Sequence, residues 1–266
     1  MRKSAVAGKF YSDSPTELQK EVSSFINVPS KKQNALGILS PHAGYVYSGA
    51  VAGAVFSAID LPKSFVIIGP NHSGRGETAS INSKEEWKMP GAIIKMNSRL
   101  AEIIKSKNNA IKEDSIGHRY EHSLEVQIPF IQSFLDDFDI VPICIQHLDY
   151  STCKEMGIAI ARSIKEYGEP VLIVASSDMT HYESQKSAEQ KDRMAIDQII
   201  KLDPKGLFDT VRKHSISMCG FIPATIMLIA CKELGAERAE MIKYMTSGDV
   251  SGDYDQVVGY AGVVVV

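Results

Sequence analysis

Residues 36–49 read LGILSPHAGYVYSG, and this stretch decides the fold class. It opens with a short apolar run that suits a buried strand and that stops at Ser40-Pro41. His42 follows in a glycine-flanked loop, and the small apolar residues from Ala50 onward are compatible with a helix. In an open α/β sheet, ligands collect outside the carboxyl ends of the strands. We therefore expect His42 to face a ligand.

The same pattern occurs twice more along the chain. The strand-like run at 65–69 leads into a loop with His72, and the run at 170–175 leads into SSDMTH, which ends at His181. A single histidine of this kind is more often a structural group. Three histidines in equivalent positions after strands indicate one shared metal or catalytic centre.

Strand-like and helix-like segments alternate along the whole chain. This alternation predicts a single α/β domain over residues 1–266, with a mostly parallel central sheet flanked by helices on both faces. We expect helices from Pro15 to before Val28, at 49–59, 98–106, 152–167, 187–201, 204–213 and 220–234, and one that begins near Glu121. Strands are expected at 139–145, 170–176, 239–245 and 257–265.

Composition narrows the classes of partner and location. The formal net charge is −3 and no basic run is present, so nothing in the charge pattern supports nucleic acid or an anionic membrane as a partner. The longest apolar runs, near 221–231 and 257–266, are shorter than the roughly 20 residues that span a bilayer. The N-terminus lacks the apolar region of a signal peptide, so a cytoplasmic location is predicted. The four cysteines form no CxxC pair and are predicted to be reduced.

Three residues are the candidate metal ligands. Imidazole binds iron, zinc and copper well, and His42 and His72 follow sequential strands, which are often neighbours in a sheet. We predict that both bind one metal ion. Cys219 is the natural third ligand, because it precedes an apolar helix whose N-terminus would lower the pKa of the thiol and favour the thiolate. The alternative for Cys219 is a buried inert thiol.

Asp178 and His181 form an Asp-x-x-His pair within one loop. A carboxylate in this position can orient an imidazole that acts as general base. The alternative is that Asp178 caps a turn and His181 packs beside it. His122 is predicted to be a polar group that lines the pocket and supports catalysis. The other histidines are assigned to the surface or to structural roles: His118, His147 and His214.

Several segments in a fixed order point to a known family. They are VAGKFY at 6–11, SPHAGY at 40–45, GPNH at 69–72, EHSLE at 121–125, SDMTH at 177–181 and TSGD at 246–249. Over nearly its whole length the chain resembles the Memo family, which is related in fold to the class III extradiol ring-cleaving dioxygenases.

The resemblance implies a single α/β domain with a metal site on His42, His72 and Cys219, and with Asp178 and His181 nearby. In the related dioxygenases two histidines and a glutamate hold iron(II), and a further histidine acts as acid/base. Here Cys219 takes the place of the carboxylate, and a thiolate selects softer metals and is itself oxidisable. Ring cleavage is therefore not carried over. A divalent transition metal is expected, iron first, with copper or zinc as alternatives.

Three functions follow from these residues. The leading hypothesis is a non-heme metal-dependent oxidoreductase, dioxygenase-like, with His181 as acid/base and an unknown small molecule or peptide as substrate. A second is a cysteine-dependent hydrolase that uses Cys219 as nucleophile. A third is a non-catalytic module that binds a peptide or phosphopeptide in the same cleft, where Arg75 and Arg119 would pair with an anion. The sequence leaves oligomerisation open.

Overall fold

The deciding stretch forms a strand, a loop and a helix in that order. In the computed structural model, which describes residues 1–266, strand β2 covers Gly37–Ser40 and helix α2 covers Tyr45–Ser57. The loop between them carries His42. The helix begins four residues earlier than the expected position 49, because Tyr45 is buried and continues the apolar face of α2.

The chain contains twelve strands, all in one sheet, and nine α-helices. The remaining strands are β1 (Arg2–Lys3), β3 (Ser64–Pro70), β4 (Ala79–Ile81), β5 (Trp87–Met89), β6 (Ala92–Met96), β7 (Lys112–Glu113), β8 (Asp139–Ile145), β9 (Val171–Ser176), β10 (His181–Glu183), β11 (Ala239–Thr246) and β12 (Val257–Val265). The remaining helices are α1 (Pro15–Phe25), α3 (Ser98–Lys107), α4 (Ile128–Gln132), α5 (Tyr150–Tyr167), α6 (Gln185–Ile200), α7 (Pro204–Lys213), α8 (Phe221–Leu234) and α9 (Gly248–Ser251), with a 3-10 turn at Glu125–Gln127.

The centre of the sheet is parallel, as predicted. Strands β8, β3, β9 and β2 lie side by side in that order, and β12 then pairs with β2 in the antiparallel direction. Ser40 at the end of β2 stands opposite Ser176 at the end of β9. The carboxyl ends of β2, β3 and β9 therefore meet at one edge of the sheet, and the loops that follow them adjoin.

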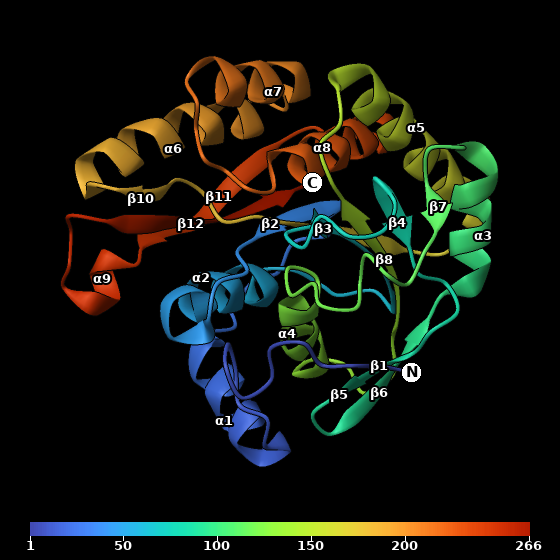
Figure 1. The fold of residues 1–266 in the computed structure, drawn as a ribbon, viewed down its shortest axis with the longest axis horizontal. Coiled ribbons are helices and arrows are strands. Elements are labelled where there is room, and N and C mark those ends of the chain that lie inside the picture. Colours follow the sequence, from blue (N-terminus) through green and yellow to red (C-terminus); the bar gives the residue numbers. More distant parts are fainter.

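Helices cover both faces of this sheet (Figure 1). Helices α3, α5, α6, α7 and α8 pack over one core cluster of 42 buried residues, and α1, α2 and α4 pack over a second cluster of 26. Helix α8 is buried from Ile222 to Cys231, which agrees with its apolar composition on all sides. No helix is both long enough and apolar enough to cross a membrane.

The N-terminal strand is tied to the segment that precedes α4. The Arg2 guanidinium pairs with the carboxylate of Glu125 at 2.5 Å, and it donates to the carbonyl oxygens of His118 (2.6 Å) and Glu121 (2.5 Å). Glu125 also accepts from the Tyr11 hydroxyl at 2.6 Å. These contacts hold the loop 118–125 against the first residues of the chain.

Two expectations for this loop are wrong. The helix predicted to begin near Glu121 starts only at Ile128, after the 3-10 turn, because the Glu121 side chain accepts from the backbone N–H groups of His122 and Ser123 and holds them outside a helix. His118 is not on the surface: it is fully buried. Its Nε2 donates to the Ser80 carbonyl at 3.0 Å, a contact between segments that only the fold brings together.

Candidate metal centre

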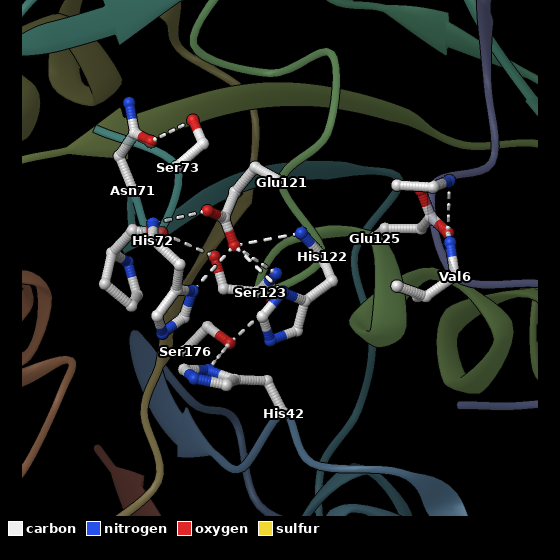
Figure 2. Close-up of polar contacts among 12 residues, drawn as sticks. Val6, His42, Asn71, His72, Ser73, Glu121, His122, Ser123, Glu125 and Ser176 are labelled. Atoms are coloured by element: carbon white, nitrogen blue, oxygen red, sulfur yellow. Dashed lines mark hydrogen bonds and ion pairs between the residues drawn. The ribbon is translucent and has the colours of Figure 1, made fainter. Parts of the chain in front are cut away.

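Three imidazole rings converge at the carboxyl edge of the sheet. One nitrogen from each of His42, His72 and His122 lies within 4.8 Å of the other two. The ring centroids are 5.2 Å apart for His42 and His72, 5.5 Å for His42 and His122, and 4.6 Å for His72 and His122. Figure 2 shows the three rings around one common space, with Glu121 beside His72 and Ser176 beside His42. This spacing makes the three nitrogens possible ligands of one metal ion.

The tautomer of His42 follows from its partner. The Ser176 hydroxyl donates its only hydrogen to the Ser123 carbonyl at 2.6 Å, so its oxygen accepts from Nδ1 of His42 at 2.9 Å. The lone pair of the ring is therefore on Nε2. Burial, and then the neighbouring imidazoles, hold the pKa of His42 well below its usual value. His42 is a neutral imidazole with a defined ligand atom.

Ser176 is itself held by Gln127. The Nε2 of Gln127 donates to the Ser176 hydroxyl and to the Pro41 carbonyl, both at 2.9 Å. Sequence reasoning missed both residues, and only the position of Ser176 at a strand end signalled the first.

We expect Ser176→Ala to weaken metal binding by about 10- to 100-fold, since residues that orient metal-bound histidines contribute this much. The matched control is Ser163→Ala, which removes an equally buried hydroxyl that bonds only within α5. The measurement is competition for metal against a chromophoric chelator. Equal losses in the two variants would contradict the role assigned to Ser176.

His72 is held by a buried carboxylate. Its Nδ1 donates to Glu121 at 2.9 Å, and Glu121 also accepts from the backbone N–H groups of His72 (2.6 Å), His122 (2.9 Å) and Ser123 (2.8 Å). Burial opposes the ionisation of Glu121, but the hydrogen bond from His72 and its charge outweigh burial and lower the pKa of Glu121 to about 2. The pKa of His72 is correspondingly raised, since Glu121 outweighs the effect of burial.

This carboxylate–histidine pair is the arrangement that commonly supports a metal-bound imidazole, because it leaves the lone pair on Nε2. Glu121 is not among the site residues predicted from the sequence. The one feature of the sequence that could have indicated a role for Glu121 is its position directly before His122 in the segment EHSLE.

His122 is one of the three converging imidazoles as well as part of the cavity lining. Its ring stacks on that of His72 with an interplanar angle of 19°. The Phe10 ring meets it edge-on, with 4.9 Å between the two ring centroids. Burial lowers the pKa of His122, which favours the neutral imidazole. The structure thus places His122, with His42 and His72, among the possible metal ligands.

Cys219 lies beside Nε2 of His42, the nitrogen with the free lone pair. Its Sγ is 3.1 Å from Nε2 of His42, but it is not part of the group of atoms that are mutually within 4.8 Å. Burial, and then the charge of Asp178, raise the pKa of the Cys219 thiol well above its usual value. The expected lowering of this pKa is therefore wrong, because burial outweighs the hydrogen bonds that favour the thiolate. The hydrogen bond indicates a protonated thiol that donates to His42.

Asp178 and His181 both face this region but do not bond to each other. Asp178 accepts from the backbone N–H of His42 at 2.7 Å, and burial raises its pKa to about 6. Nδ1 of His181 donates instead to the Ser217 carbonyl at 3.0 Å. The interpretation that Asp178 orients His181 is therefore wrong: a backbone carbonyl on the segment before α8 does so, and the tertiary fold supplies it.

The rings open onto a cavity of about 550 Å³. Its lining includes His42, His72, His122, Asp178 and His181, together with aromatic side chains and residues near α9, and it contains no lysine or arginine. Its carboxylates are Asp178 and Asp253. The two arginines considered for anion binding, Arg75 and Arg119, lie outside this lining.

Comparison with known proteins agrees with this architecture. A profile described as Memo-like protein matches residues 2–264. A MEMO1 family protein of Methanosarcina barkeri is 43% identical over the full length of both chains, and one of Pyrobaculum aerophilum is 41% identical over 99% of this chain and 98% of its own. Among solved structures, the uncharacterized protein JW3007 from Escherichia coli K12 aligns with a TM-score of 0.57 at 12% identity, over 86% of this chain and 98% of that one. This last likeness shows the fold alone.

Proposed function

The chain belongs to the Memo-like protein family, and on that basis we propose that it is a metal-dependent oxidoreductase acting on a small molecule in the cavity. His42 and His72 are the primary ligands in this proposal, His122 completes the set of three nitrogens, and Cys219 is a further donor beside His42. The observation that carries the proposal is the convergence of three imidazoles, two of them with a fixed tautomer, on one space.

The donor set suits a transition metal. Imidazole and thiolate select iron, copper or zinc over magnesium and calcium, which prefer oxygen ligands. When bound, iron or copper would supply Lewis acidity and a one-electron redox couple, which is the chemistry that an oxidoreductase requires. A thiolate from Cys219 would favour a softer ion over magnesium or calcium.

The remaining residues have separate tasks. His181, whose Nδ1–H is engaged by Ser217, has Nε2 available to take or give a proton inside the cavity. Asp178 positions the backbone of His42. Phe10 packs edge-on against the His122 ring and so helps to hold its orientation.

The alternatives have less support. In a cysteine hydrolase His181 would activate Cys219, but the imidazole nearest to the sulfur is that of His42, and the thiol does not line the cavity. In a phosphopeptide module a cation would meet the phosphate, but the lining offers only the carboxylates Asp178 and Asp253 as charged groups other than histidine.

The test is metal content after anaerobic purification and reconstitution with iron(II), copper or zinc. We expect near-stoichiometric metal in the wild type, its loss in His42→Ala, and no change in His214→Ala, which removes an exposed histidine at the end of α7. Cobalt(II) substitution should show a sulfur-to-cobalt absorption band that Cys219→Ala abolishes. Metal-dependent oxygen consumption then tests the reaction class. Absence of metal from the reconstituted wild type would overturn the proposal.

A further inference from the structure

Tyr182 has an unusual backbone conformation at the edge of the cavity. Its φ is +56°, in the left-handed region that tyrosine rarely adopts. It lies in β10, where His181 stands opposite Val258 and Glu183 stands opposite Val257 of β12. Tyr182 is therefore the extra residue of a β-bulge.

The bulge changes the direction of one side chain. Consecutive residues of a regular strand point to opposite faces of the sheet, but His181 and Tyr182 both line the cavity. Their ring centroids are 6.0 Å apart at an interplanar angle of 62°. Bulges next to functional sites commonly re-aim a side chain in this way.

The two neighbours of Tyr182 hold it in this conformation. The backbone N–H of His181 donates to the Ser217 hydroxyl at 2.8 Å, and Glu183 accepts from Ser187 and Lys191, both at 2.6 Å. Tyr182 is 72% exposed, so core packing does not account for its position. A left-handed residue costs free energy and persists where the surroundings impose it.

We propose that Tyr182 is a specificity-determining residue whose ring contacts a flat, apolar part of the ligand while the other end of the ligand reaches the histidine centre. The lining supports this: Tyr47 and Phe10 add aromatic surface, and no lysine or arginine is present to bind an anionic group. A ring-bearing substrate is thereby favoured over a small polar one. The inference rests on the proposed function for the site at which the ligand is held.

Two hydroxamates form a matched pair of probes, because benzohydroxamate and acetohydroxamate share a metal-chelating head and differ in a phenyl against a methyl group. Calorimetric titrations would use the wild type, Tyr182→Asn and Tyr182→Phe, each metal-loaded and each after chelator treatment. Asparagine tolerates the left-handed region, so Tyr182→Asn removes the ring without disturbing the bulge, and its Tm should not fall.

We expect Tyr182→Asn to lose about tenfold in affinity for benzohydroxamate, the magnitude of one aromatic contact. Acetohydroxamate should bind all forms alike, and Tyr182→Phe should behave as the wild type. Equal losses for both probes would overturn the proposal, as would unchanged or undetectable benzohydroxamate binding. If the wild type holds no metal, the metal-content measurement overturns the proposed function. The role of Tyr182 is still decided in chelator-treated protein, by the ratio of the benzohydroxamate affinities of the wild type and Tyr182→Asn.

Discussion

Replacing Glu125 by alanine should lower the free energy of unfolding by about 3–5 kcal/mol, because it leaves a buried charge without its partner. The side chains of Arg2 and Glu125 are 2% and 0% exposed. Glu125 also accepts from the backbone N–H groups of Ala5 and Val6 and from the Tyr11 hydroxyl, and these donors would lose their acceptor. Urea unfolding followed by circular dichroism measures the change.

The matched control for this prediction is Asp137→Ala. Asp137 pairs with Lys95 at 3.0 Å, but both side chains are about two-thirds exposed, so solvent screens the pair and the unfolding midpoint should stay nearly unchanged. If the urea midpoint of Glu125→Ala stays as close to the wild-type value as the midpoint of the control does, the buried pair makes no net contribution to stability.

Replacing Glu121 by glutamine should weaken metal binding by about 100-fold, the upper end of the effect of residues behind a metal-bound histidine. The glutamine amide presents N–H groups where the carboxylate accepts four hydrogen bonds, and the tautomer of His72 is no longer fixed. Chelator competition measures the affinity, and circular dichroism shows whether the variant is folded.

Glu113→Gln is the control for Glu121→Gln. Glu113 is likewise a carboxylate that accepts several hydrogen bonds. Its donors are the hydroxyl and backbone N–H of Ser83 and the ammonium of Lys105, away from the histidines. Its variant should bind metal like the wild type. A folded Glu121→Gln protein with unchanged metal affinity would refute the supporting role of Glu121.

Part of the site follows from local patterns in the sequence. The runs before His42 and His72 predict buried strands, and parallel strands end at one edge of a sheet. Their convergence is therefore predictable without coordinates, and the structure confirms it with ring centroids 5.2 Å apart. The conformation of segment 121–125 is harder to predict. A helix was expected there, but the backbone conformation depends on hydrogen bonds to the Glu121 carboxylate.

The sequence by itself determined the fold class, the family and the edge of the sheet where the histidines lie, because strand length, apolar runs and loop residues are local properties of the chain. Only the tertiary structure decided the partner of each imidazole: Ser176 for His42, Glu121 for His72 and the Ser217 carbonyl for His181. These partners are 134, 49 and 36 residues away along the chain. A hydrogen bond tolerates differences of only a few tenths of an ångström in the distance between donor and acceptor. Between remote segments that distance is set by strand register and packing.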